Sequence, residues 1–165
     1  MIVYGPLAII LVLLLVGPIR GRSLRQLERV APGSLAFTVA NRRRFSDALS
    51  LVGVGTDLGT RAAYLTSGPG VTADAFGLSF WDNTPFVFVG AIDWDRIAAI
   101  GVRDLQTPYR RWTPTAIVLE VAVDGATIEL PLLSPNGTSR MFSSRRESAF
   151  LASRLESLRS AAVPA

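Results

Sequence analysis

The sequence contains no cysteine, no histidine and no lysine, and each absence excludes a class of chemistry. Without cysteine there are no disulfides and no thiol nucleophiles. Without histidine as well, zinc sites of the usual ligand types and Ser-His or Cys-His catalytic pairs are excluded. Without lysine there is no Schiff-base amine and no phosphate-binding lysine. All 17 basic residues are therefore arginine, which suggests a GC-rich bacterial coding bias.

The remaining composition is strongly apolar. Of 165 residues, 49% are hydrophobic, and the mean hydropathy is +0.36. This length predicts one domain, large enough to bury a stable hydrophobic core without disulfides or a structural metal. The hydropathy is high for a soluble protein because the apolar excess is concentrated at the start of the chain.

Residues 1–19 carry no charged side chain, and the stretch from Leu7 to Val16 contains only Leu, Ile, Val and Ala. As a helix, 19 residues span about 28 Å, close to the hydrocarbon thickness of a bilayer. A cleaved signal peptide and a buried core helix are the alternatives. A signal peptide would need a basic leader and a good cleavage site, and this sequence has neither. A core helix of a soluble domain would need polar positions at helical spacing, and none occur here. We therefore expect a single transmembrane helix over residues 1–19.

Four arginines follow this span closely: Arg20, Arg22, Arg25 and Arg29. No basic side chain precedes the span, and positive flanks stay in the cytoplasm. We therefore expect a plasma-membrane protein with its N-terminus outside and its C-terminal domain in the cytoplasm. Residues 20–33 form a basic juxtamembrane linker in this interpretation, with room for a helical turn. Anionic lipids would attract such a segment, although its charge could also serve as a topology signal alone.

The charge is unevenly distributed over the rest of the chain. Residues 20–44 hold seven arginines against one glutamate, whereas residues 45–133 hold five arginines against ten acidic residues. An acidic middle argues against nucleic-acid binding despite the high isoelectric point.

Patterns of apolar and turn residues predict short strands with two helices. A helix is expected over residues 42–52 and another after the capping-box pattern of Ser144 and Glu147. The terminal helix should bury a stripe, point Arg159 outward and fray over residues 161–165. Strands are expected over residues 34–40, 61–66, 70–74, 77–81, 86–89 and 98–103, and the buried stripe comprises Phe150, Leu151, Leu155 and Leu158.

The clearest element is a hairpin around Asp124-Gly125, a strong signal for a type I′ turn. A two-residue loop there places Leu119 opposite Leu130, and the pairs Val123–Ala126, Val121–Ile128 and Ile117–Leu132 fall on the same face.

The other face of this hairpin brings two carboxylates together. Glu120 lies opposite Glu129, an unfavourable pair that a neighbouring arginine would offset. Pro131 lacks an N–H group and indicates an edge strand or a bulge.

The chain resembles small bacterial pleckstrin-homology-like membrane proteins in four places: the sequence motifs over residues 74–81 and 92–100, the hairpin, and the final helix. The resemblance covers about residues 60–160. It implies an α+β, mainly β fold: a pleckstrin-homology-like antiparallel barrel or sandwich over residues 34–160, closed by a C-terminal helix. With the N-terminal transmembrane helix, this gives the expected architecture. The resemblance also implies a binding or scaffolding module without shared catalytic residues. A strand followed by a helix over residues 34–59 departs from this pattern.

One exposed loop combines basic and aromatic groups: Tyr109, Arg110, Arg111 and Trp112. Arginine pairs well with phosphate, and aromatic rings insert at membrane interfaces. Arg103 could point the same way. These five residues are the candidate ligand or membrane contacts, with an ordinary solvated loop as the alternative.

Two further motifs give weaker evidence for a functional site. The glycine-rich residues 53–59 resemble a nucleotide-binding loop, but a strand is expected to follow instead of a helix. Asp93 and Asp95 flank Trp94, and solvated turn carboxylates beside a core tryptophan are the expected outcome. No catalytic, cofactor or metal site is predicted.

These observations favour a non-enzymatic, membrane-tethered interaction module at the cytosolic face of the plasma membrane, binding a protein or a lipid headgroup. One alternative is a structural subunit of a membrane complex that contacts its partners through the span. Another is an enzyme that uses only Asp, Glu, Arg, Ser or Tyr, although no Gly-x-Ser-x-Gly motif is present. The oligomeric state is left open.

The arginines after the span generate a topology prediction. A reporter enzyme that is active only in the periplasm, fused after Ala165, should remain inactive in bacterial cells. A cytoplasm-active reporter at the same position should work. Activity of the periplasmic fusion would reverse the orientation.

Overall fold

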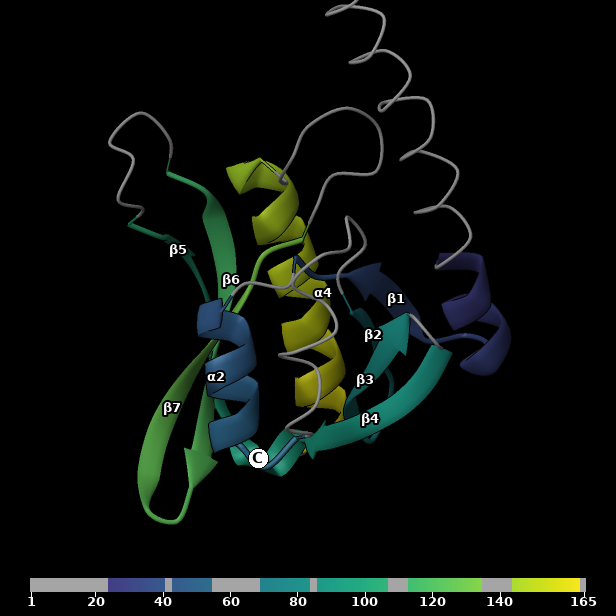
Figure 1. The fold of residues 1–165 in the computed structure, drawn as a ribbon, viewed down its shortest axis with the longest axis horizontal. Coiled ribbons are helices and arrows are strands. Elements are labelled where there is room, and N and C mark those ends of the chain that lie inside the picture. The colour runs from purple at the N-terminus through teal and green to yellow at the C-terminus, as the bar shows by residue number, and fades with distance from the viewer. Residues whose placement is uncertain are drawn as a thin grey trace, which may run out of the picture.

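The fold is α+β and mainly β, as expected: two antiparallel sheets and a C-terminal helix (Figure 1). The computed structural model describes residues 24–40, 43–54, 69–83, 86–106, 113–134 and 144–163. Residues 24–30 are helical. The labelled elements are β1 (Leu35–Thr38), α2 (Arg43–Leu51), β2 (Gly70–Ala73), β3 (Gly77–Asn83), β4 (Phe86–Asp93), η2 (Trp94–Arg96), β5 (Ile97–Asp104), β6 (Thr115–Val123), β7 (Ala126–Leu132) and α4 (Arg145–Ala162).

Within the described ranges no helix is both long enough and apolar enough to cross a membrane. The predicted span over residues 1–19 and the predicted strand over residues 61–66 lie outside those ranges.

The strands form a four-stranded sheet, β1-β2-β3-β4, and a three-stranded sheet, β5-β6-β7. The short 3-10 helix η2 joins them. Trp94 in η2 is only 2% exposed, and its Nε1 donates to the Asp74 carbonyl at 2.8 Å. It is therefore the core residue that the sequence predicts, whereas Asp93 and Asp95 beside it are exposed.

The predicted β6–β7 hairpin is confirmed to the residue. Asp124 and Gly125 have φ angles of 48° and 81°, as a type I′ turn requires. Leu119 pairs with Leu130, both fully buried, and Glu120 pairs with Glu129. Because β7 is an edge strand, Pro131 breaks no further ladder, as expected.

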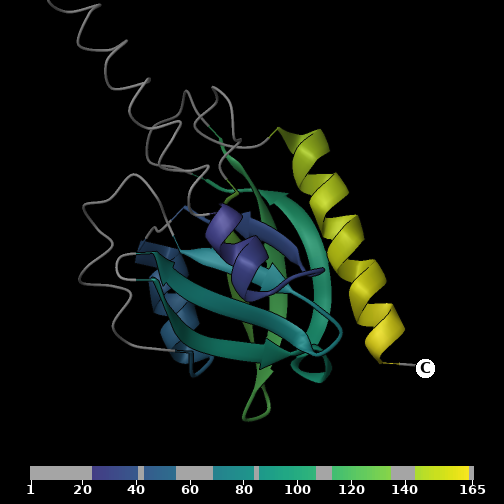
Figure 2. The same cartoon turned by 90° about the vertical axis from the view of Figure 1, so that its right-hand side faces the viewer.

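The core lies between the inner faces of the two sheets, and two helices complete it. The predicted helix α2 buries Phe45, Leu49 and Val52 and lies along β7. Helix α4 packs against β5 and β6. Figure 2 shows the two helices on opposite sides of the strands.

Helix α4 begins with the predicted capping box: the Ser144 side chain accepts from the Glu147 N–H, and the Glu147 side chain accepts from Ser144. Three expectations about this helix are wrong. Phe150 is 67% exposed, because Ser148 and Ala152 are the residues that approach the sheet. The helix also continues to Ala162, so it does not fray at residue 161.

Arg159 does not point outward as expected. Its Nη1 donates to the carbonyls of Ile97 and Ala98, at 2.9 and 3.2 Å. The register of β5 against β6 shifts between Ile97 and Ala99, where the regular ladder is interrupted. The guanidinium therefore supplies donors to backbone carbonyls at this irregularity.

The buried hairpin generates a stability prediction. Leu119→Ala should lower the free energy of unfolding by about 2–5 kcal/mol, because it opens a cavity in the core. Leu51→Ala is the matched control, since Leu51 is 64% exposed and should cost less than about 0.5 kcal/mol. Denaturant unfolding of the full chain in mild detergent measures both. Equal losses would contradict the assigned inward face.

Candidate functional site

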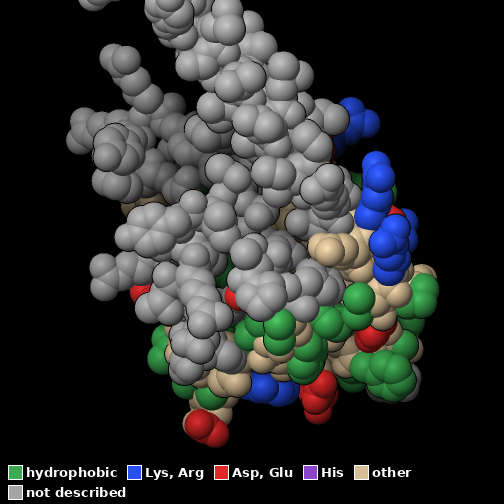
Figure 3. Space-filling model, turned by 45° about the vertical axis from the view of Figure 1, so that its right-hand side comes forward, with side chains coloured by type: hydrophobic (Ala, Val, Ile, Leu, Met, Phe, Trp, Pro, Cys, Tyr) green, Lys and Arg blue, Asp and Glu red, His purple; other side chains and the backbone are tan. Residues whose placement is uncertain are grey.

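The two juxtamembrane arginines within the described ranges, Arg25 and Arg29, are exposed on the helix of residues 24–30. They are four residues apart and therefore lie on one helical face. Figure 3 shows basic side chains beside a group of hydrophobic ones on this side of the molecule. Arg20 and Arg22 lie outside the described residues.

Arg103, a predicted ligand contact, is engaged within the sheet. Its Nη2 donates to Glu120 Oε1 at 2.9 Å, and its Nη1 donates to Glu129 Oε1. It is thus the neighbouring arginine that the like-charged pair on the hairpin requires. Any external anion would have to compete with two carboxylates for this guanidinium.

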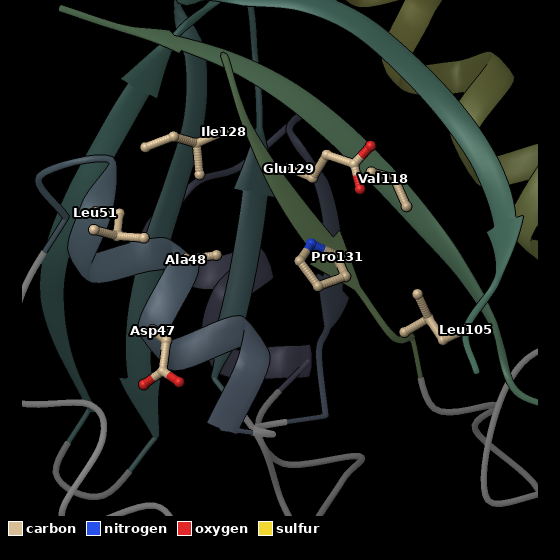
Figure 4. Close-up of a pocket in the computed structure, with 8 residues that line it drawn as sticks. All are labelled: Asp47, Ala48, Leu51, Leu105, Val118, Ile128, Glu129 and Pro131. Atoms are coloured by element: carbon tan, nitrogen blue, oxygen red, sulfur yellow. The ribbon is translucent and has the colours of Figure 1, made fainter. Parts of the chain in front are cut away.

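Beside this ion-pair cluster lies a groove of about 330 Å³ between α2 and the β6–β7 hairpin (Figure 4). In the close-up, Leu51 and Ile128 mark one end of the groove and Leu105 marks the other. We call it the α2–β7 groove. Its lining residues are Asp47, Ala48, Leu51, Leu105, Val118, Ile128, Glu129 and Pro131.

The groove walls are mainly apolar, with two carboxylates. Leu51 is 64% exposed, although Ala48 and Leu49 on the same helix are buried in the core. Glu129 is held by Arg103, and Asp47 is exposed on α2. An open apolar groove with acidic groups is suited to apolar side chains that carry or adjoin a positive charge.

The predicted contact loop with Tyr109, Arg110, Arg111 and Trp112 lies outside the described residues. Its two flanks are joined, because the Leu105 N–H donates to the Pro114 carbonyl at 2.8 Å. Leu105 also lines the α2–β7 groove, so this described flank of the loop lies at one end of that groove.

The glycine-rich motif has a structural explanation at its first residue. Gly53 has φ +82° and follows α2, where Val54 N–H donates to the Leu49 carbonyl and Gly53 N–H to the Ser50 carbonyl. This is the hydrogen-bond pattern of a Schellman C-cap, which accounts for the glycine without a phosphate. Residues 55–59 lie outside the described ranges.

In the described ranges, no three Asp, Glu, His or Cys side chains gather as a metal site. Sequence reasoning missed the α2–β7 groove, because it depends on where α2 lies relative to the hairpin. One signal was available: Leu51 is a large apolar residue off the stripe of Phe45, Leu49 and Val52.

Comparisons with protein-family models, with curated proteins and with solved structures found no match to this chain.

The ion-pair cluster generates a second stability prediction. Arg103→Gln should lower the free energy of unfolding by about 1 kcal/mol at low salt, because two exposed ion pairs are lost and the two glutamates then repel each other. Adding Glu129→Gln should restore part of the loss. Unfolding curves at low and high salt test this, since screening should shrink the effect. An unchanged stability at low salt would refute the proposed charge balance.

Proposed function

We propose that this chain is a non-enzymatic interaction module of the pleckstrin-homology-like type. In this proposal, residues 1–19 tether it to the cytosolic face of the plasma membrane. The α2–β7 groove then binds a segment of a partner protein.

The order of elements supports the fold assignment. A four-stranded and a three-stranded antiparallel sheet, followed by one C-terminal helix, match the layout implied by the sequence resemblance. Helix α2 between β1 and β2 is an addition to that layout. Because α2 also forms one wall of the groove, the departure from the family pattern coincides with the candidate site.

The observation that carries the proposal is the exposure of Leu51 at the rim of an apolar groove. A large apolar side chain that the fold leaves 64% exposed beside Ile128 offers a contact area for another protein. At about 330 Å³ the open groove would accept one or two side chains of a peptide segment.

The charges in the groove favour a protein segment over a lipid headgroup. The cluster of Arg103, Glu120 and Glu129 keeps a net negative charge, and Asp47 adds a further carboxylate to the lining, so a phosphate is disfavoured. Arg103, the arginine of this cluster, is already bridged to both Glu120 and Glu129. A segment with an apolar anchor and a nearby arginine or lysine is complementary to this surface.

Site-specific photo-crosslinking tests the groove in cells that produce the full chain. A photoreactive phenylalanine analogue at position 51 should give a discrete protein adduct. The matched control is the same analogue at Phe150, which is 67% exposed on α4 on the other side of the strands. The adduct at position 51 should disappear when Ile128→Arg is added, because a charge then occupies the groove wall.

Adducts that form equally at positions 51 and 150 would contradict the proposal. An adduct that survives Ile128→Arg would contradict it as well, since contact would not depend on the groove. Circular dichroism of the Ile128→Arg variant establishes that the fold is retained.

A further inference from the structure

We infer that the outer face of the four-stranded sheet, next to the helix of residues 24–30, contacts anionic phospholipid headgroups. Trp81 and Phe88 supply the interfacial rings, and Arg25 and Arg29 supply the phosphate partners. This inference rests on the proposed function only in that the chain is tethered to a membrane.

The helix of residues 24–30 is fixed to the sheet by one close contact. Leu27 is fully buried, and a Cβ at Gly70 would lie only 2.8 Å from its two terminal methyl groups. The absence of a side chain at Gly70 therefore lets the leucine pack directly on β2. The segment that the sequence predicts as a linker is, over these residues, a docked helix.

Strand register places the aromatic pair beside this helix. Gly70 pairs with Trp81, and Trp81 pairs with Phe88, so the three residues form a row across β2, β3 and β4. Neighbouring strands are about 5 Å apart, which puts Phe88 on the order of 10 Å from the Leu27 contact. Val71 and Ala73 point into the core, so Gly70 and Thr72 belong to the outer face.

The two rings form a structured surface feature. Trp81 and Phe88 have ring centroids 5.3 Å apart at 68°, an edge-to-face arrangement. The Trp81 Nε1 donates to Thr72 Oγ1 at 3.0 Å, which fixes the indole across the outer face and covers Thr72. Phe88 remains 52% exposed. The patch thus presents one oriented indole and one open ring.

Charge on the adjoining helix selects the occupant. Arg25 and Arg29 lie on the side of the helix away from Leu27, and both are exposed, with Glu28 the only acidic residue in the helix. Figure 3 shows blue side chains next to green ones on this face. An exposed Phe88 ring next to a half-buried Trp81, on a face that adjoins a helix with two arginines, matches the headgroup region of an anionic membrane, where rings sit at the interface and arginines meet phosphates.

Chain length provides the second argument for lipid. The predicted span ends at Ile19, and the first described residue, 24, already belongs to the docked helix. Four residues lie between them, and the five steps from residue 19 to residue 24 reach at most about 17 Å even when fully extended. The helix of residues 24–30 is fixed to the sheet through Leu27, and only this short segment separates it from the predicted span. The domain therefore stays within contact distance of the bilayer surface.

A spin-label experiment on the full chain tests the contact, and the natural absence of cysteine makes single labels simple to place. Phe88→Cys carries a nitroxide at the proposed contact, and Thr127→Cys carries one at an exposed control site on β7. Each labelled chain is reconstituted into vesicles of phosphatidylcholine mixed equally with phosphatidylglycerol. Collision with an aqueous nickel complex and with oxygen reports depth. The label at position 88 should be shielded from nickel, and the label at 127 should not.

Arg25→Gln with Arg29→Gln, or vesicles of phosphatidylcholine alone, should remove most of the shielding at position 88. A second measurement keeps the Phe88 ring: brominated phosphatidylglycerol should quench tryptophan emission, and Trp81→Phe should abolish more of that quenching than Trp94→Phe. Quenching that is equal in the two variants would overturn the inference.

Other outcomes separate the two proposals. If the chain floats with the vesicles but positions 88 and 127 are equally accessible to nickel, the lipid contact is wrong and the tether stands. If the chain does not float with the vesicles, both the lipid contact and the membrane tether are wrong. If the shielding at 88 survives the arginine substitutions and comes with broadening between labels, the face binds a second copy instead of lipid.

Discussion

The sharp turn from β4 to β5 is the constraint on which the rest of the structure depends. Each sheet is apolar on one face, and neither could bury that face alone. The buried Trp94 in η2 makes the turn between the sheets. The same corner also holds both helices: Arg96 donates to the Val52 carbonyl at the end of α2, and Arg159 of α4 donates to the Ile97 carbonyl. Sheet packing and helix placement are therefore set at one point.

Features that depend on nearby residues could be predicted from the sequence. The hairpin was predictable to the residue, because the Asp124-Gly125 turn and the alternation of apolar residues require the same register. The capping box at Ser144 was predictable for the same reason, since both of its partners lie within one helical turn. In each case two independent local signals agreed.

Features that depend on distant residues were not predictable. The pairing of Glu120 with Glu129 was predicted, but the arginine that offsets it was not, because Arg103 reaches both only through the β5–β6 register. The side of α4 that faces the sheet was decided by the small residues Ser148 and Ala152, and so Phe150 was misassigned. The α2–β7 groove and the contact of Leu27 with Gly70 likewise depend on packing between elements far apart in the chain.

Leu27 on Gly70 also has a mechanical consequence. A flexible linker absorbs rotation and pulling, whereas a helix seated on a sheet transmits both. Gly70 is hydrogen-bonded between β1 and β3, in register with Thr38 and Trp81. Force or torque arriving at residue 24 would thus pass into the middle of the four-stranded sheet and, through the shared core, to the hairpin. Leu27 therefore fixes the orientation of the helix relative to the sheet, and its removal would let the domain rotate about residues 24–30.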